Sequence, residues 1–370
     1  MARWHLIFWE PTASPHKADL LRALAAAPQV ASCTAVAQQE MSAGRAALGW
    51  ALGAQDRARF IVSPSDEQVR AIVDSAPPDA VHILSGIRHV PCIEQALALV
   101  LAGKRRFGIM SEPRAFDGAA GLARLAHSLF TEGPLRRQSA FVLAIGRNGP
   151  PWFRMAGYGR DRIFPFGYFI APSPALDGRD FDGTVRLGYL GRLTREKGIH
   201  LFLDAIGKLT VPASISIAGA GAEEALVHQA AARAPNPFHF AGAVPMAETA
   251  RFLRDQDIVV VPSTTRDDGW GVVVSEALMA GAAVIATKQV GASVCLTPPG
   301  NGIAINPSST AIADAVCALV VQNGLDARAR ASRRKWACDH LVGEAGARHL
   351  LGALDTAFHA RPPQALFFTE

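Results

Sequence analysis

Two cations stand five positions apart in the segment Leu187–His200, which reads LGYLGRLTREKGIH. A buried strand is predicted to end at Gly191, so Arg192 and Lys197 fall in the loop and at the start of the next helix. Positive side chains at this place can neutralise a diphosphate from one side, and the planar guanidinium of Arg192 can do so through two parallel hydrogen bonds. The segment therefore predicts a site for a phosphorylated ligand.

A second segment, Asp257–Thr287, joins a buried strand to a helix that is expected to begin near Gly271. The free amides of the first helical turn and the positive end of the helix dipole attract a phosphate. Gly269 and Gly271 let the backbone approach such a group closely. Glu276 falls in the second turn of this otherwise apolar helix. Its carboxylate is expected either to be solvated or to accept hydrogen bonds from hydroxyl groups of a ligand.

Strand-like apolar runs that alternate with amphipathic helical stretches must position these groups. The pattern is typical of parallel sheets covered by helices on both faces, and it predicts two doubly wound α/β domains. The predicted helices include 17–26, 92–102, 326–340 and 344–358. The predicted strands are 5–9, 30–36, 59–62, 80–84, 107–110, 141–145 and 163–166 in the first half, and 185–190, 214–218, 238–240, 258–261 and 283–285 in the second.

A stretch rich in Pro, Asp and Gly at residues 171–183 separates the two halves and is predicted to be a linker. We therefore expect an N-terminal Rossmann-like domain at 1–170 and a C-terminal one at 184–340. The helix and tail at 341–370 are expected to return to the N-terminal domain. Ligands of such sheets bind at the carboxyl ends of the strands, so two facing domains imply a cleft between them.

Composition excludes several classes of protein. Across 370 residues, 49% are hydrophobic and 19% are charged, which supports two cores and excludes a disordered or fibrous chain. No apolar run approaches the roughly 18–20 residues of a membrane helix. The N-terminal apolar run is too short for a signal peptide, so a cytoplasmic location is expected. The five scattered cysteines have no C-x-x-C spacing and are expected to be buried free thiols.

The formal excess of +5 positive charges lies entirely in residues 1–180. It includes the clusters Lys104–Arg106 and Arg136–Arg137, which could face an anionic membrane surface or a pyrophosphate-bearing partner, or form a solvated face. No helix-turn-helix, zinc or aromatic–basic signature accompanies the charge, so nucleic-acid binding is not expected.

The second half resembles the donor-binding half of a GT-B glycosyltransferase of the large retaining family 4, also called glycosyl transferases group 1. The resemblance rests on motifs that occur in the family's order. They are GRLTREKG at 191–198, IAGAGAE at 217–223, FAGAV at 240–244, VPS at 261–263 and DGWGVVVSEALMAG at 268–281.

This resemblance implies a nucleotide-sugar donor in the C-terminal domain, with Arg192 and Lys197 on its diphosphate and Glu276 on its ribose. Asp268 stands where the family usually has a glutamate on a sugar hydroxyl. The side chain is one methylene shorter, a departure that can alter which sugar fits. These four are the expected catalytic residues. The other expected donor-binding positions, among which 242–244 line the base, are Gly191, Gly219, Gly242, Val244, Gly269, Trp270, Gly271 and Val272.

The N-terminal domain matches the family less well, because the usual glycines of the first strand-to-helix loop are replaced by Glu10–His16, EPTASPH. His16 is a candidate for contact with the acceptor or a phosphate, or it is a helix-capping position without a ligand. Glu112 follows a predicted strand and is a candidate for acceptor or sugar binding, with an ion pair to Arg114 as the alternative.

The expected reaction is transfer of a sugar, with retained anomeric configuration, from a UDP- or GDP-sugar to a saccharide or lipid-linked saccharide. In the implied mechanism the leaving phosphate accepts the acceptor's proton, so neither a protein base, a cofactor nor a metal is required. The acceptor would belong to bacterial surface polysaccharide synthesis, with peripheral contact at the inner membrane face. A nucleotide-sugar-binding partner with little turnover is an alternative, as are an epimerase or a phosphorylase of the same architecture.

Overall fold

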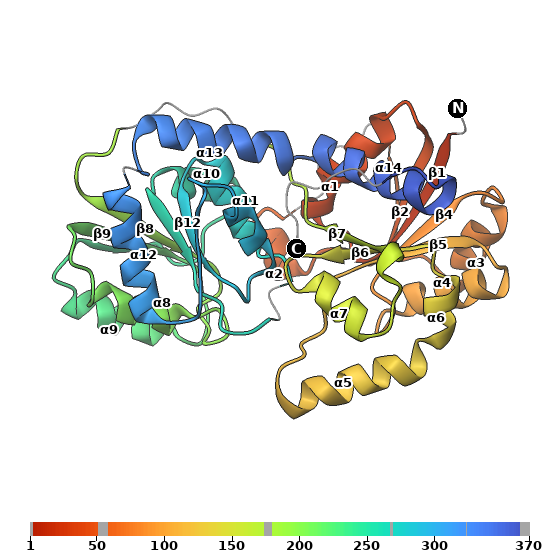
Figure 1. Ribbon diagram of the computed structural model, residues 1–370, viewed down its shortest axis with the longest axis horizontal. Coiled ribbons are helices and arrows are strands. Elements are labelled where there is room, and N and C mark those ends of the chain that lie inside the picture. Colours follow the sequence, from red (N-terminus) through yellow and green to blue (C-terminus); the bar gives the residue numbers. More distant parts are fainter. Residues whose placement is uncertain (1–2, 51–57, 174–179, 267–268, 323, 363–370) are drawn as a thin grey trace. The chain divides into compact units, whose positions relative to one another are not determined.

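The computed structural model describes residues 3–50, 58–173, 180–266, 269–322 and 324–362. The chain divides into two compact units. Unit 1 comprises the described residues up to Ala171 and those from Leu341 onward, and unit 2 comprises those from Pro172 to His340. Figure 1 shows that each unit is a sheet covered by helices.

Within its described residues, unit 1 contains a parallel sheet in the order β3-β2-β1-β4-β5-β6-β7. Its strands are β1 (Trp4–Thr12), β2 (Val30–Gln39), β3 (Arg59–Val62), β4 (Val81–Ser85), β5 (Arg106–Ser111), β6 (Phe141–Ile145) and β7 (Ile163–Phe166). Its α-helices are α1 (Pro15–Ala26), α2 (Ala43–Ala47), α3 (Asp66–Ser75), α4 (Pro91–Ala102), α5 (Gly118–Thr131), α6 (Gly133–Gln138), α7 (Gly149–Met155) and α14 (Gly343–His359).

The described part of unit 2 repeats this architecture with a parallel sheet in the order β10-β9-β8-β11-β12-β13. Its strands are β8 (Val185–Leu190), β9 (Ala213–Ala218), β10 (Phe238–Phe240), β11 (Ile258–Val261), β12 (Ala283–Thr287) and β13 (Gly302–Ile305). Its α-helices are α8 (Ile199–Ile206), α9 (Glu224–Arg233), α10 (Met246–Arg254), α11 (Val272–Met279), α12 (Ser309–Val321) and α13 (Ala327–His340).

The predicted pair of doubly wound domains is confirmed. Every residue of β6, β11 and β12 is buried, as a parallel strand covered on both faces requires. The predicted strands fall on observed ones, several with identical limits. The sequence analysis did not predict β13, whose first three residues are only half-buried, because a short strand at the sheet edge has a weak apolar signal.

Helix α14 belongs to unit 1 although it follows all of unit 2 in the sequence. It packs on α1, where the Asp19 carboxylate accepts a hydrogen bond of 2.7 Å from the backbone N–H of Gly343. Arg22 pairs with both Asp19 and Glu344, at 2.7 and 2.8 Å. These contacts satisfy a backbone donor at the start of α14 and fix the helix against α1.

One arginine of each basic cluster of unit 1, Arg105 and Arg136, turns inward to the carbonyl end of a helix, whereas Arg106 and Arg137 are exposed. Arg105 donates to carbonyls at and after the end of α3, among them Val73 at 3.2 Å. Arg136 donates to the carbonyls of Ser128 and Leu129 in α5, at 2.9 and 2.6 Å. Because the last carbonyls of a helix lack intrahelical partners and carry negative partial charge, such contacts stabilise the helix ends.

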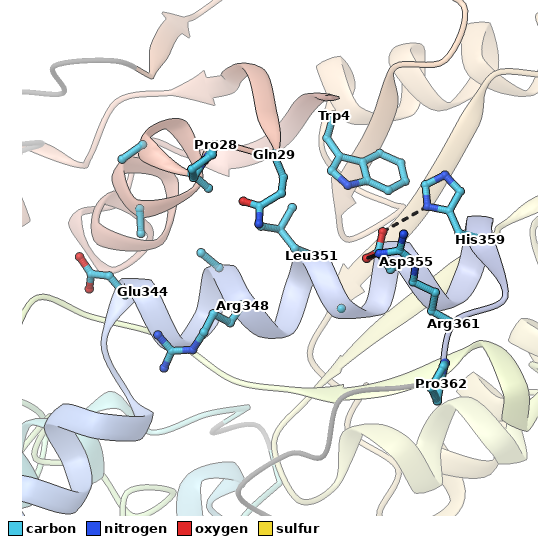
Figure 2. A pocket seen from close by; sticks show the side chains of 15 residues that line it. Trp4, Pro28, Gln29, Glu344, Arg348, Leu351, Asp355, His359, Arg361 and Pro362 are labelled. Carbon is cyan, nitrogen blue, oxygen red and sulfur yellow. Dashed lines mark hydrogen bonds and ion pairs between the residues drawn. The ribbon is translucent and has the colours of Figure 1, made fainter. Parts of the chain in front are cut away.

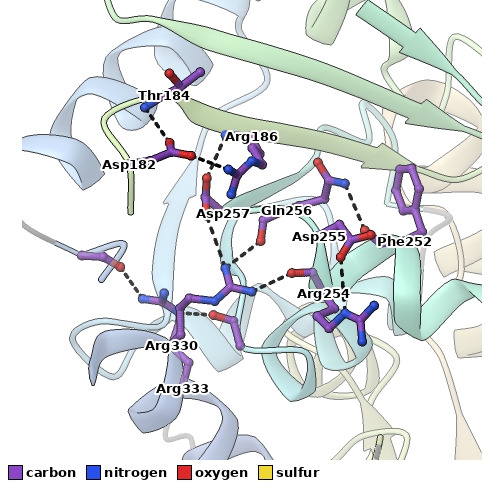
Figure 3. Close-up of polar contacts among 12 residues, drawn as sticks. Asp182, Thr184, Arg186, Phe252, Arg254, Asp255, Gln256, Asp257, Arg330 and Arg333 are labelled. Carbon is purple, nitrogen blue, oxygen red and sulfur yellow. Dashed lines mark hydrogen bonds and ion pairs between the residues drawn. The ribbon is translucent and has the colours of Figure 1, made fainter. Parts of the chain in front are cut away.

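Unit 2 uses three arginines of α13 in the same way, and Figure 3 shows Arg330 among its partners. Arg330 donates to the carbonyls of Arg254 and Gln256, both at 2.7 Å, just where α10 ends. Arg333 donates to Gly281, Gly300 and Gly324 at 2.6–3.0 Å, and Arg334 to Met279 at 2.6 Å. Burial lowers the pKa of Arg333 to about 10. This basic cluster therefore joins helix ends inside the unit.

Among the described residues, no helix is both long enough and apolar enough to cross a bilayer. Cys33, Cys92 and Cys295 are buried free thiols, as predicted, whereas Cys317 and Cys338 are half-buried. Burial raises the pKa of Cys92 to about 11, so this thiol stays protonated at neutral pH.

Candidate functional site

The loops that follow β8, β9 and β10 are joined by backbone hydrogen bonds at the carboxyl edge of the unit 2 sheet. Gly191 donates to the carbonyl of Ala218 at 3.0 Å, and Gly219 donates to that of Gly242 at 2.7 Å. Three motifs from separate parts of the sequence therefore meet at one edge. In doubly wound sheets this is the edge at which ligands bind.

Two glycines permit this close approach. A Cβ on Gly219, whose φ is +147°, would lie 1.8 Å from the carbonyl oxygen of Gly191. A Cβ on Gly198, whose φ is +72°, would lie 1.9 Å from the carbonyl oxygen of Pro262. Any side chain would push the β8 loop away from its neighbours, so these positions require glycine.

The β8 loop is also held against the exit of β11, the neighbouring strand at which the strand order reverses. The backbone N–H of Thr264 donates to the carbonyl of Glu196 at 2.8 Å. The hydroxyl of Thr264 donates to the carbonyl of Arg195 at 3.1 Å. On the other side, the Thr287 hydroxyl at the end of β12 donates to the Ser263 carbonyl at 2.6 Å. The loop that carries Arg192 and Lys197 thus has a fixed backbone at the switch point of the sheet.

Arg192 is exposed, and its guanidinium has no hydrogen bond or ion pair among the residues that the structure describes. Its backbone is fixed, since the Tyr189 hydroxyl donates to its carbonyl at 2.8 Å. Lys197 is half-buried, immediately before the glycine that begins α8. Its backbone N–H donates to the Thr194 hydroxyl at 3.4 Å. The predicted pair of cations therefore follows β8, with the Arg192 donors left available to an anion.

Helix α11 begins at the same edge, after β11. Gly271 precedes it with φ +81° and provides no side-chain cap. The N–H groups of Val272 and Val273 have no intrahelical acceptor and lie at the positive end of the helix dipole. The helix begins where the sequence predicted, after the β11 exit that contacts the β8 loop, and the binding of an anion by its first amides stays a prediction.

Glu276 lies one turn further along α11 and is half-buried. Burial raises the pKa of its carboxyl to about 7. Within the described part of the chain no side chain forms a hydrogen bond or ion pair with it. A carboxyl that is partly withdrawn from water without a protein partner suits the recognition of a ligand hydroxyl.

The remaining predicted donor positions divide into two groups. Gly242 and Val244 are half-buried beside the β9 loop. Trp270 instead is 1% exposed, and its indole N–H donates to the Ser275 hydroxyl at 3.0 Å. Its ring therefore packs in the core, and a role of this position in donor binding stays a prediction. Asp268 and its neighbour Asp267 lie outside the described residues.

The sequence analysis missed a further cation at this edge. Lys288 is exposed and directly follows the buried strand β12, which pairs with β11. Its N–H donates to the carbonyl of Ile305 at 2.9 Å. A cation that follows a buried apolar run is the same signal that identified Arg192, so the sequence could have indicated it.

The switch point of the unit 1 sheet contains a buried ion pair that the sequence did not predict. Glu10, near the end of β1, is 4% exposed and pairs with Lys17 from the first turn of α1. Ser85, the last residue of β4, donates to Glu10 at 2.8 Å and accepts from Lys17 at 2.7 Å. These three groups therefore satisfy one another at the position where unit 2 presents the exposed Arg192.

His16 precedes Lys17 in α1. Ser14 caps this helix, accepting a hydrogen bond of 3.4 Å from the N–H of His16. The imidazole packs edge-on against Trp50, with ring centroids 4.6 Å apart. Burial, reinforced by Arg45, lowers its pKa to about 4, so the ring is neutral at pH 7. Its buried Nε2 has no hydrogen-bond partner among the described residues. A neutral imidazole with one open nitrogen can donate to or accept from a ligand.

Glu112 follows β5 in unit 1 and is half-buried. The Tyr168 hydroxyl donates to its carboxylate at 2.7 Å. Arg114, the alternative partner considered from the sequence, donates instead to the Ser128 hydroxyl at 3.4 Å. Tyr168, which follows β7, thus orients the Glu112 carboxylate. The role of this carboxylate toward a ligand stays a prediction.

A groove of about 980 Å³ lies elsewhere in unit 1, between α1 and α14 (Figure 2). Trp4 and Gln29, which line it, stand at the amino ends of β1 and β2. Because the strands are parallel, this groove is at the opposite edge of the sheet from Glu10 and Ser85. Among the described residues, no group of three or more His, Cys, Asp or Glu side chains could hold a metal ion.

Comparisons with known proteins agree with this geometry. Residues 184–322, nearly all of the unit 2 sheet and its helices, match the family model described as Glycosyl transferases group 1. A search of curated proteins finds no match to the chain.

Solved GT-B glycosyltransferase structures share the fold of the whole chain. The crystal structure of Anabaena HepE in complex with UDP has a TM-score of 0.69 at 15% identity, covering 95% of this chain and 100% of that one. HepE in complex with UDP-glucose gives 0.65 at 16% identity, covering 95% and 99%. The apo form of the lipopolysaccharide outer core galactosyltransferase WaaB gives 0.68 at 12% identity, covering 96% and 99%.

Proposed function

We propose that this protein is a glycosyltransferase that binds a nucleoside diphosphate sugar at the carboxyl edge of the unit 2 sheet. One observation carries the proposal. The loop with Arg192 and Lys197 is held by backbone contacts against the exit of β11, within the residues that match the glycosyltransferase family model. The helix start at Gly271 follows that exit in the chain.

In this proposal Arg192 and Lys197 neutralise the diphosphate as it departs, together with the first amides of α11. The groups are preorganised because their backbone is fixed before the ligand binds. Glu276 accepts hydrogen bonds from hydroxyl groups of the donor, for which the ribose is the expected partner. The anomeric configuration is retained, the departing phosphate oxygen takes the acceptor's proton, and no protein base is needed.

UDP-sugars are the first donors to test, because the HepE structures contain UDP and UDP-glucose. GDP-sugars remain the second choice. Asp268 is expected to contact the sugar, and its shorter side chain would influence which sugar is accepted.

The acceptor in this proposal is a saccharide or a lipid-linked saccharide of a bacterial surface polysaccharide. It would bind unit 1, where His16 and Glu112 are the candidate contacts. The open Nε2 of His16 supports this assignment for that residue. The enzyme would then work at the cytoplasmic face of the inner membrane.

A nucleotide-sugar-binding partner without turnover is the second candidate. It is favoured by the first strand-to-helix loop of unit 1, in which Pro15 and a closed ion pair at Glu10 stand where the family usually has glycines. Such a protein would bind the donor at the same edge but transfer nothing.

Thermal unfolding with UDP, GDP, ADP and their glucose conjugates tests the proposal. Ligands that bind the folded state raise the melting temperature by mass action, so one nucleotide series should stabilise the full chain. Hydrolysis of the stabilising sugar nucleotide is then compared between the parent and Glu276→Ala. A measurable parental rate that falls in the variant supports an enzyme, whereas binding without any rate identifies the inert partner. If none of the nucleotides shifts the transition, the proposal is wrong.

A further inference from the structure

Helix α5 of unit 1 presents an almost wholly apolar face to solvent, and Figure 1 shows it at the periphery of its unit. Leu122, Leu129 and Phe130 are 69%, 42% and 88% exposed. The four alanines of the helix are exposed as well, while its buried residues are Gly121 and Ser128. Contiguous exposed apolar residues of this kind mark surfaces that bind a partner or a membrane.

The rest of the unit fixes the orientation of this helix. On its inner side Leu125, with Phe116 from the preceding loop, packs on the core cluster that contains Trp152. At its carboxyl end Arg136 donates to the carbonyls of Ser128 and Leu129. The exposed face is therefore a defined feature of a packed helix.

Helix α7 extends the apolar surface. Its last residue, Met155, is 43% exposed. The turn that follows lies beside α5, because the position of a Cβ on Gly157 is 3.5 Å from Leu129 Cδ2. We call Leu122, Leu129, Phe130 and Met155 the α5 surface.

Positive charge predominates around the α5 surface. Residues 118–160 contain six arginines and one acidic residue, Glu132, and the exposed Asp117 and Asp161 flank this range. Glu132 is 4% exposed and paired with Arg88 at 2.8 Å, so it contributes no exposed negative charge. Arg137 is exposed, and its Nη1 lies 3.4 Å from the Cβ position of Gly133, directly after the end of α5.

We propose that the α5 surface docks onto an anionic lipid bilayer. The apolar side chains enter the boundary between headgroups and acyl chains, and the arginines contact the lipid phosphates. A second copy of the chain fits this surface poorly, because the arginines of both copies would be brought together. The inference goes beyond the proposed sugar transfer and does not depend on it, since adhesion to a bilayer requires no turnover.

Flotation of the full chain with lipid vesicles tests the proposal without donor or acceptor. Binding is expected to vesicles of phosphatidylcholine mixed with phosphatidylglycerol, to weaken as salt is raised, and to be weaker on phosphatidylcholine alone. The pair Leu122→Ser and Phe130→Ser should reduce binding by about tenfold or more. Arg137→Gln should reduce it by a smaller factor, mainly at low salt.

Val321→Ser is the matched control, because Val321 is an apolar residue of α12 that is 81% exposed. This variant should bind vesicles like the parent. All the substituted side chains are exposed, so the variants should retain the parental melting temperature, which is measured alongside. Equal binding by the parent and the α5 double variant would overturn the proposal. So would a dimer in sedimentation equilibrium that the double variant dissociates, because a second copy would then occupy the surface.

Discussion

The switch points of the two sheets have the same topology but opposite electrostatic states. In unit 2 the loop after β8 carries an exposed Arg192 whose guanidinium has no partner within the described residues. In unit 1 the cation at the equivalent place, Lys17, is closed in an ion pair with Glu10 and a hydrogen bond to Ser85. The sheet edge of unit 2 therefore leaves the positive charge of Arg192 available to a ligand. At the edge of unit 1, Glu10 neutralises the positive charge of Lys17.

The difference shows that fold alone does not specify a binding site. Both edges collect strand ends and a helix start, as parallel α/β sheets must. What distinguishes unit 2 is that Gly198 and Gly219 bring loops into backbone contact, so that these contacts fix the backbone of the loop that carries Arg192 and Lys197. Unit 1 holds its cation with a carboxylate instead.

The largest effect is expected from breaking the buried ion pair between Glu10 and Lys17. Lys17→Met leaves the Glu10 carboxylate buried without a counter-charge and should lower the free energy of unfolding by about 3–5 kcal/mol, measured by urea denaturation. Lys335→Met removes an exposed pair with Asp339, in which Lys335 is 77% exposed, and should leave the free energy of unfolding almost unchanged, because water screens such a pair. If both variants lower the free energy of unfolding equally, the ion pair between Glu10 and Lys17 is not buried as described.

The next effect concerns the loop contacts of unit 2. Gly198→Ala places a Cβ against the Pro262 carbonyl and should destabilise the protein by about 2 kcal/mol or more. Thermal unfolding with and without UDP also reports loss of nucleotide binding. Gly300→Ala is the control, since φ there is +93° but no atom lies within 4 Å of the new Cβ. Full UDP binding by Gly198→Ala would contradict the role of this contact.

Removal of the exposed cation Arg192 should weaken the binding of UDP without destabilising the folded protein. Arg192→Ala deletes charge-assisted hydrogen bonds and should raise the Kd for UDP by about 10- to 100-fold in calorimetric titration, with an unchanged melting temperature. Arg195→Ala, in the same loop and 67% exposed, should alter it no more than about threefold. Equal losses in both variants would indicate a general charge effect of the loop.

The last expected effect is the pH dependence of stability that Glu276 causes. Its pKa is about 7 in the folded protein against 4.5 for an unburied glutamate, so the folded state binds a proton more tightly than the unfolded state. Stability from this group is full below pH 4.5 and is lost as the pH rises to 7. The difference in unfolding free energy between the parent and Glu276→Gln should decrease over this interval by at most about 3 kcal/mol.

The exposed Glu248 on α10 provides the control for this titration. Glu248→Gln makes the same substitution at an exposed side chain and is measured in parallel, so that the pH dependence of Glu276→Gln is judged against it. A flat difference for Glu276→Gln would show that its carboxyl is not desolvated.

Local sequence patterns were sufficient to predict the fold and to indicate the carboxyl edge of the unit 2 sheet as a candidate site. The limits of β8 and β11 follow from short apolar runs. Arg192 lies two positions after the end of β8, and Gly269 and Gly271 lie eight and ten positions after the end of β11. Such features require no knowledge of distant residues, so the sequence could indicate the edge of unit 2.

The features that were missed depend on contacts between distant residues. Glu10 and Ser85 are 75 positions apart, and no periodicity reports that they meet. The loop of Trp270 could place its indole inward or outward, and packing decided for the core. Arg105 and Arg136 looked like surface charge, because a sequence does not show which helix carbonyls an arginine will reach.

A crystal structure of the full chain with UDP is the most direct test of the central claim. The account predicts the diphosphate at the carboxyl edge of the unit 2 sheet, within hydrogen-bonding distance of the Arg192 guanidinium and the Lys197 ammonium. The first amides of α11 would complete its surroundings. A diphosphate bound at any other place, with both cations directed into solvent, would contradict the account.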